Sequence, residues 1–223
     1  ELSRGNIPGL EIDHSPEKTG MFVLAMGKMG AHELNYSSDI DLICFFDETQ
    51  FLEEKYFDAR KGFIRATRLM SSILSDLTED GYVFRTDLRL RPDPSVNPVC
   101  IATETAERYY ESLGRTWERA AYIKARVVAG DTKAGINFLH SLTPFVWRKY
   151  LDFAAIEDAH DIRLRIREHK GLGGALKLLG HNIKLGTGGI REIEFIVQAF
   201  QLIRGGQEKH LQSRELVEVL DML

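Results

Sequence analysis

The stretch Asn35-Tyr-Ser-Ser-Asp-Ile-Asp-Leu-Ile-Cys-Phe45 places two acidic residues at the head of an apolar run. If this run is a β-strand, Asp39 and Asp41 share a face, because residues i and i+2 of a strand point the same way. Two desolvated carboxylates repel each other and need a cation unless solvent reaches them. Oxygen ligands favour Mg²⁺ or Mn²⁺. The pair therefore indicates either a divalent-metal site or a solvated strand end.

A glycine turn lies just upstream of this stretch. The apolar run Phe22-Val-Leu-Ala25 leads into Met26-Gly-Lys-Met-Gly30, which predicts a strand followed by a turn. Glycines permit close backbone approach to a phosphate, and exposed N–H groups can cradle it. The spacing fits neither the P-loop nor the dinucleotide fingerprint. The order of strand, glycine turn, short helix and a strand opening with Asp-x-Asp is that of a nucleotidyltransferase.

A third acidic residue should then come from a neighbouring strand, and Val83-Phe-Arg-Thr-Asp-Leu-Arg-Leu-Arg91 supplies one. Alternation predicts a strand with four polar residues on one face: Arg85, Asp87, Arg89 and Arg91. An aspartate among arginines is either part of a salt-bridged surface ladder or a metal ligand within a polyphosphate-binding wall. The pattern leaves both interpretations open.

These motifs resemble those of the glutamine synthetase adenylyltransferase/adenylyl-removing enzymes. The similar segments are Gly27-Lys-Met-Gly30, Glu33-Leu-Asn-Tyr-Ser-Ser-Asp-Ile-Asp-Leu42, Asp87-Leu-Arg-Leu-Arg-Pro92, Trp117-Glu-Arg119, Lys124-Ala-Arg126 and Ile183-Lys-Leu-Gly-Thr-Gly-Gly-Ile-Arg-Glu-Ile-Glu-Phe195. The resemblance runs from about Met21 to the end of the chain. Ala31 departs from it, because the family often has a second glycine there. A methyl group is tolerated if that φ is negative.

The family has two related halves, and this chain resembles the N-terminal half, which removes AMP. The segments that carry this choice are Trp117-Glu-Arg-x-Ala, Gly189-Ile-Arg-Glu-Ile-Glu-Phe and Leu202-Ile-Arg-Gly-Gly206. The implied reaction is phosphorolysis of adenylyl-tyrosine on glutamine synthetase, which gives ADP and regulates nitrogen assimilation. An ATP-dependent adenylyltransferase acting on the same tyrosine and a non-catalytic regulatory module are the alternatives.

The resemblance also implies the site residues and partners. Asp39, Asp41 and Asp87 would be catalytic and bind Mg²⁺ or Mn²⁺. Nucleotide or phosphate contacts would come from Gly27, Lys28, Gly30, Ser38, Arg89 and Arg91. The implied partners are adenylylated glutamine synthetase, nucleotide, orthophosphate and, through the full-length enzyme, a PII-type signal protein.

Composition agrees with a globular piece of such an enzyme. The 223 residues are 43% hydrophobic and 28% charged, and the net charge of −4 gives no general case for nucleic-acid or membrane binding. The two cysteines form no Cys-x-x-Cys, which fits a reducing cytoplasm. The chain starts without Met and ends within a helical pattern, so we expect an excised fragment.

We predict an α+β fold in three parts. Residues 1–19 form an irregular lead-in. Residues 20–98 form a nucleotidyltransferase domain with a polymerase-beta-like mixed sheet, flanking helices and a long helix within 53–78. Residues 99–223 form an all-helical bundle, with helices at about 103–113, 115–128, 131–145, 152–170, 189–204 and 212–223.

Two features of the helical region have alternative roles. Gly186-Thr-Gly-Gly189 opens a helix whose N-terminus either holds an anion or is capped by the acidic Glu192 and Glu194. Three basic residues either bind nucleotide phosphates or are paired within the fold: Arg119, Lys124 and Arg126.

Overall fold

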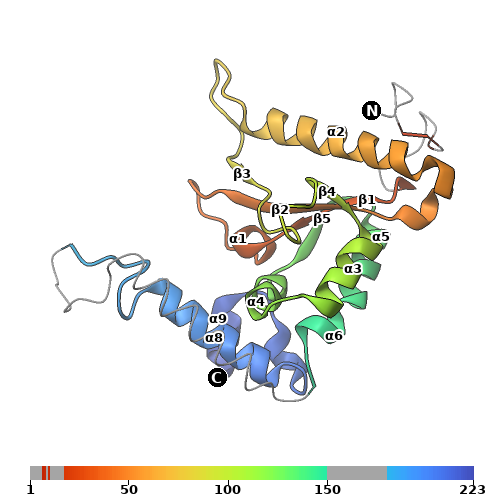
Figure 1. Ribbon diagram of the computed structural model, residues 1–223. Coiled ribbons are helices and arrows are strands. Elements are labelled where there is room, and N and C mark those ends of the chain that lie inside the picture. Colours follow the sequence, from red (N-terminus) through yellow and green to blue (C-terminus); the bar gives the residue numbers. More distant parts are fainter. Residues whose placement is uncertain (1–6, 9, 11–17, 150–179) are drawn as a thin grey trace. The chain divides into compact units, whose positions relative to one another are not determined.

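The computed structural model describes residues 7, 8, 10, 18–149 and 180–223 (Figure 1). The helix predicted at 152–170 and most of the predicted lead-in lie outside these residues. The chain divides into two compact units, one of Glu1–Gly114 with Lys124–Thr143 and one of Arg115–Ile123 with Pro144–Leu223. Within the described part, none of the helices is long and apolar enough to cross a lipid bilayer.

Strands and helices alternate irregularly along the chain, which confirms the α+β class. In chain order the described elements, with η for 3₁₀ turns, are β1 (Met21–Ala25), α1 (Gly27–Gly30), β2 (Ile40–Phe46), η3 (Glu48–Gln50), η4 (Glu53–Lys55), α2 (Tyr56–Ser75), β3 (Thr86–Asp87), β4 (Cys100–Ala102), α3 (Thr103–Ser112), α4 (Thr116–Ile123), β5 (Arg126–Gly130), α5 (Thr132–Ser141), α6 (Thr143–Val146), α8 (Ile190–Arg204), η5 (Lys209–Gln212) and α9 (Leu216–Met222).

The first unit is built on a mixed sheet with β2 at its centre. β1 runs antiparallel to β2, and β5 runs antiparallel to β1. β3 and β4 both pair in parallel with β2, β3 beside its first two residues and β4 beside its last three. Since β1 occupies one edge of β2, β3 and β4 follow each other along the opposite edge.

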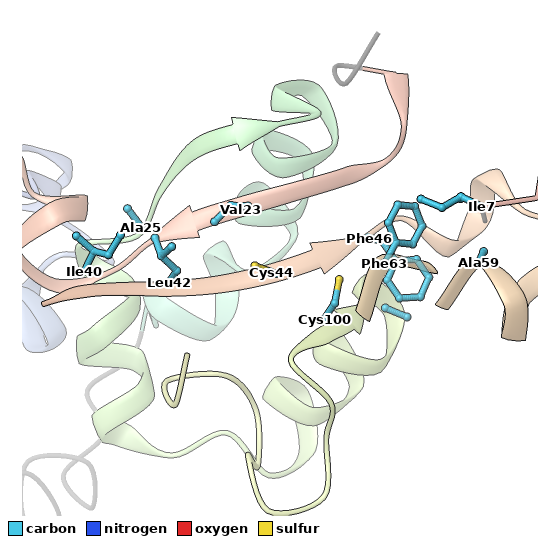
Figure 2. Close-up of a cluster of buried hydrophobic side chains, with 11 residues drawn as sticks. Ile7, Val23, Ala25, Ile40, Leu42, Cys44, Phe46, Ala59, Phe63 and Cys100 are labelled. Carbon is cyan, nitrogen blue, oxygen red and sulfur yellow. The ribbon is translucent and has the colours of Figure 1, made fainter. Parts of the chain in front are cut away.

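Apart from Asp41 near the start of β2, the central strands β1 and β2 are apolar because helices cover both of their faces. On one face the ring of Phe46 stacks on Phe63 of α2, with ring centroids 5.0 Å apart (Figure 2). On the other face Phe138 of α5 lies 4.6 Å from Phe45 and 5.6 Å from Phe22, measured between centroids. The long helix predicted within 53–78 is confirmed as α2.

The strand predicted over 83–91 is much shorter, because β3 contains only Thr86 and Asp87. The backbone N–H of Arg89 donates to the Asp87 carboxylate at 2.8 Å. A local side chain-to-backbone bond of this kind competes with a strand ladder and favours a turn. Arg89 and the residues after it therefore leave the sheet, and the predicted four-residue polar face does not form along one strand.

The region predicted to be all-helical from residue 99 onward contains two strands of the sheet, β4 and β5. The helix predicted at 115–128 ends at Ile123 as α4. Val127 and Val128 instead lie in β5, which pairs with the edge of β1. β-Branched residues suit a strand, and an unpaired strand edge offers a partner that local periodicity does not reveal.

The other described helices follow the predicted pattern. The helix predicted at 103–113 is α3, which ends at Ser112. The single helix predicted at 131–145 is divided into α5 and α6, and α6 ends at Val146. In the second unit, α8 and α9 correspond to the helices predicted at 189–204 and 212–223. Val197 of α8, Leu211 of η5 and Val219 of α9 form a buried apolar cluster within that unit.

The two cysteines face each other across neighbouring strands. Cys44 of β2 is in register with Cys100 of β4, and both are fully buried (Figure 2). Burial raises the pKa of the Cys44 thiol to about 12 and that of Cys100 well above its ordinary value. Both thiols are therefore neutral at physiological pH, and a neutral buried thiol is a poor nucleophile.

We expect Cys44 and Cys100 to resist iodoacetamide at pH 8 in the native protein. Because alkylation requires opening of the sheet, labelling should be at least about 10³-fold slower than in urea. Mass spectrometry of the labelled peptides measures both rates, and a Ser95→Cys variant supplies an exposed thiol as control. Native labelling as fast as that of the control would contradict the buried placement.

Candidate active site

The parallel pairing of β2 with β3 brings two of the predicted carboxylates together. Asp41 and Asp87 are directly opposite each other in the ladder. The N–H of Ile40 donates to the carbonyl of Arg85 at 2.8 Å, which fixes this register. Asp39 lies just before β2, and its side chain is 55% exposed, whereas that of Asp87 is 17% exposed.

Gly27 makes room for one of these carboxylates. Its φ is +53°, a conformation that glycine adopts without a steric penalty. A Cβ at this position would lie 3.0 Å from a carboxylate oxygen of Asp41. The N–H of Met26 also donates to the Asp41 carbonyl at 2.9 Å. The glycine turn therefore lies directly beside the start of β2.

Gly30 is required by backbone packing. A Cβ there would lie 1.9 Å from the carbonyl oxygen of Lys124 and 2.6 Å from that of Ala25. Its N–H donates to the Met26 carbonyl at 3.1 Å. Contact of Gly30 with a phosphate stays a prediction, but the packing alone accounts for a glycine at this position. Ala31 has a φ of −84°, the negative value that its methyl group requires.

Lys124 and Arg126 support the glycine turn from the side of β5. The guanidinium group of Arg126 donates to the carbonyls of Met29 and Gly30 at 2.9 and 3.2 Å. The ammonium group of Lys124 lies 3.0 Å from the Glu33 carboxylate, and the Lys124 side chain is only 7% exposed. Both residues are thus paired within the fold. Sequence reasoning missed Glu33 as a partner, although Glu33 opens the segment Glu33–Leu42 that contains Asp-x-Asp.

Arg85 connects the segment before β2 with the segment before β3. Its Nε donates to the Asp39 carboxylate at 2.5 Å, its Nη1 to the hydroxyl of Tyr82 at 3.0 Å, and its Nη2 to the carbonyl of Ser37. The hydrogen bond to Asp39 raises the pKa of Arg85 above its ordinary value. The neighbouring Ser38 is half-buried. Sequence alternation placed Arg85 beside Asp87 in a salt-bridged ladder or a phosphate-binding wall, but it did not identify Asp39 as the partner of Arg85.

Arg89 binds Asp87 through a bidentate contact. Its Nε lies 2.9 and 3.0 Å from the two carboxylate oxygens, and its Nη2 lies 2.5 Å from one of them. These hydrogen bonds hold the pKa of Asp87 below its usual value. Asp87, Asp41 and Asp39 all raise the pKa of Arg89, with Asp87 contributing most. Arg89 therefore lies within electrostatic reach of all three carboxylates.

Arg91 has a different environment. Its Nη1, Nη2 and Nε donate to the carbonyls of Leu88, Pro94 and Asn97 at 2.7, 3.1 and 3.2 Å. Burial lowers the pKa of Arg91. Arg91 thus holds the turn that follows β3, and its predicted phosphate contact stays a prediction. Lys28 is half-buried within the glycine turn.

The donor chemistry fits a divalent cation, although the side chains are turned toward arginines. Among the described residues, no group of three His, Cys, Asp or Glu side chains converges as metal ligands. The carboxylates of Asp39 and Asp87 contact Arg85 and Arg89 instead. Carboxylate oxygens from adjacent strands are nevertheless ligands of the kind that Mg²⁺ or Mn²⁺ prefers. Asp39, Asp41 and Asp87 would hold the ion.

The second unit contains the remaining basic and glycine-rich features. Arg119 is 2% exposed, and its Nη2 lies 3.4 Å from the carbonyl of Val146. Gly189 is the N-cap of α8, and the N–H of Gly188 donates to the Glu192 carboxylate at 2.9 Å. The start of α8 is therefore capped by its own acidic side chain, the structural one of the two predicted roles.

Comparison with known proteins agrees with these features. The profile described as "Glutamate-ammonia ligase adenylyltransferase" matches residues 5–141, and that described as "GlnD PII-uridylyltransferase" matches residues 160–222. The chain is 54% identical over 220 residues to the bifunctional glutamine synthetase adenylyltransferase/adenylyl-removing enzyme of Mesorhizobium japonicum, covering 99% of this chain and 22% of that protein.

Similar relatives with the same name occur in Rhizobium meliloti and Brucella suis. The first is 57% identical over 205 residues, which cover 92% of this chain and 21% of the relative. The second is 55% identical over 210 residues, which cover 94% of this chain and 21% of the relative. The chain thus spans about a fifth of the length of the curated relatives it matches.

A mixed sheet with paired aspartates beside a glycine turn, together with both profile matches, defines a protein of the nucleotidyltransferase class. The glutamate-ammonia ligase adenylyltransferase profile covers more than half of the residues. The chain belongs to that family.

Replacement of Arg126 by Gln should destabilise the protein by about 2 kcal/mol, because charged hydrogen bonds to two backbone carbonyls are lost. Arg108→Gln is the control, since Arg108 pairs with Glu104 on an exposed helix face and its loss should cost about 0.5 kcal/mol or less. Urea unfolding measures both. Unchanged stability with weakened phosphate binding in Arg126→Gln would favour the alternative role of Arg126 as a phosphate ligand.

Proposed function

We propose that this chain carries the adenylyl-removing site of the family, with Asp39, Asp41 and Asp87 as its catalytic carboxylates. The reaction is phosphorolysis: an oxygen of orthophosphate attacks the phosphorus of adenylyl-tyrosine on glutamine synthetase. The bond to the tyrosine oxygen breaks, and ADP and the unmodified tyrosine are released. The observation that carries this proposal is the register that sets Asp41 opposite Asp87 beside Gly27.

The residues suit a reaction between two anions. Orthophosphate is already anionic and needs no strong base, so a site of aspartates and arginines is sufficient. Arg85 and Arg89 supply positive charge beside the carboxylates. Bidentate guanidinium groups match phosphate oxygens in geometry and reduce repulsion between the nucleophile and the AMP ester. A bound Mg²⁺ or Mn²⁺ supplies charge neutralisation at the phosphoryl group and at the leaving phenolate.

The direction of the reaction rests on the resemblance to the N-terminal half of the family. Trp117-Glu-Arg, Gly189-Ile-Arg-Glu-Ile-Glu-Phe and Leu202-Ile-Arg-Gly-Gly206 support that choice. The relatives' name includes both adenylyl transfer and adenylyl removal. The alternative direction, ATP-dependent adenylylation of the same tyrosine, would use the same carboxylates, so only turnover separates the two.

The remaining proposals follow from the family. The sheet and its flanking helices would form a polymerase-beta-like catalytic domain over 20–98, followed by a largely helical region over 99–223, from which β4 and β5 pair with the sheet. The protein would act in the cytoplasm on adenylylated glutamine synthetase. A PII-type signal protein would regulate it through the full-length enzyme, and nitrogen assimilation would respond.

Incubation with adenylylated glutamine synthetase and Mg²⁺, with and without phosphate, tests the reaction by nucleotide analysis. ADP should appear only when phosphate is present. AMP incorporation from ATP into unmodified glutamine synthetase would instead assign the adenylyltransferase direction. If the chain and the full-length protein that contains it are both inactive in both assays, the non-catalytic alternative stands.

The Asp41→Asn variant should lose activity but not stability. Loss of a residue that only orients a metal ligand lowers metal affinity or activity by about 10- to 100-fold. Loss of a ligand itself should therefore lower kcat by about 100-fold or more. Stability should change by less than about 0.5 kcal/mol, because the amide is isosteric and relieves carboxylate repulsion. Asp58→Asn, on the exposed face of α2, is the matched control. An active but strongly destabilised Asp41→Asn protein would overturn the catalytic role.

A further inference from the structure

Two arginines neutralise two of the three carboxylates near the start of β2. Arg85 binds Asp39, and Arg89 binds both carboxylate oxygens of Asp87. The side chain of Arg89 is 84% exposed, whereas that of Asp87 is 17% exposed. The guanidinium group of Arg89 can therefore move into solvent without disturbing the packing around Asp87.

The arginines use the carboxylate oxygens that a metal ion would need. Both Asp87 oxygens accept from the guanidinium group of Arg89, and one of them also accepts from its backbone N–H. A cation that binds in the plane of the Asp87 carboxylate must displace this fork. Once it is bound, repulsion between like charges a few ångströms apart favours the displaced state.

We propose that Arg89 is an exchangeable counter-ion, which pairs with Asp87 until a divalent cation displaces it and which then binds phosphate oxygens of the substrate. Arg85 stays in place, because Tyr82 and Ser37 also hold it. This inference rests on the proposed function, because it takes the three aspartates as the cation site. Before exchange, the arginines relieve repulsion among the carboxylates. After exchange, the planar fork of Arg89 fits a phosphate group bidentately.

Arg91, in the same segment, is not expected to take part in this exchange. Its three nitrogens donate to backbone carbonyls of the turn after β3, and its side chain is partly buried. Release of Arg91 would leave these carbonyls without their donors. The same short segment thus contains one arginine placed to move and one that is fixed.

Titration calorimetry with Mn²⁺ alone tests the competition. Arg89→Lys keeps the charge but loses the bidentate fork, so Mn²⁺ should bind about two- to tenfold more tightly than to the wild type. Arg108→Lys is the matched control, because Arg108 pairs with Glu104 on a helix surface and its replacement should change nothing. Unchanged or weaker Mn²⁺ binding to Arg89→Lys would overturn the exchange.

Nuclear magnetic resonance of the arginine Nε–Hε groups gives a second readout. Saturating Mg²⁺ should shift the Arg89 resonance, assigned through Arg89→Lys, and leave that of Arg91 unchanged. If Mg²⁺ binds and the Arg89 resonance stays in place, the exchange is wrong while the metal site stands. If neither Mg²⁺ nor Mn²⁺ binds the wild type, the metal assignment in the proposed function fails, and the exchange fails with it.

Binding of inorganic phosphate tests the second half of the exchange. Mg²⁺ should increase the affinity of the wild type for phosphate about fivefold or more, and by linkage phosphate should increase the affinity for Mg²⁺ equally. This coupling should disappear in Arg89→Gln and persist in Arg108→Gln. Equal coupling in all three proteins would show that the released guanidinium group does not bind phosphate.

Discussion

The pairing of β2 with its neighbours is the constraint on which the rest of the structure depends. One edge of β2 is taken by β1, and the other is divided between β3 at its start and β4 at its end. The first pairing sets Asp41 opposite Asp87, and the second sets Cys44 opposite Cys100 in the core. A single strand therefore carries both the polar end of the sheet and a large part of its hydrophobic interior.

The glycine turn joins this strand to β5. Gly27 leaves space for Asp41, and Gly30 lets the turn approach the backbone of Lys124 closely. Arg126 then binds the carbonyls at the end of the turn, and the buried ammonium group of Lys124 pairs with Glu33. Charged residues distant in sequence thus fix the backbone beside the candidate site. A side chain at position 27 would meet the Asp41 carboxylate, whereas one at position 30 would meet backbone carbonyls.

Much of the fold could be predicted from local patterns. The apolar run before the glycine turn predicted β1, and the apolar run headed by Asp-x-Asp predicted β2. Helical periodicity predicted α2. β5 was missed because its stability comes from the edge of β1, which is distant in sequence. The strand over 83–91 was overestimated because alternation cannot reveal that Asp87 captures the N–H of Arg89. Alternation also cannot show that Arg89 binds a carboxylate whereas Arg91 binds backbone carbonyls, because these partners are set by the folded chain.

Because β3 is short, the candidate site should open at a lower free energy than the fold as a whole. Only Thr86 and Asp87 pair with β2, whereas β1 pairs with β2 over five residues. Opening of a two-residue ladder exposes little apolar surface, so its free energy lies well below that of global unfolding. Asp87 can therefore separate from Asp41 while the aromatic layers around Phe46 and Phe138 remain packed. Temperatures or denaturant concentrations that leave the secondary structure intact would then disrupt the candidate site, so loss of activity would precede global unfolding.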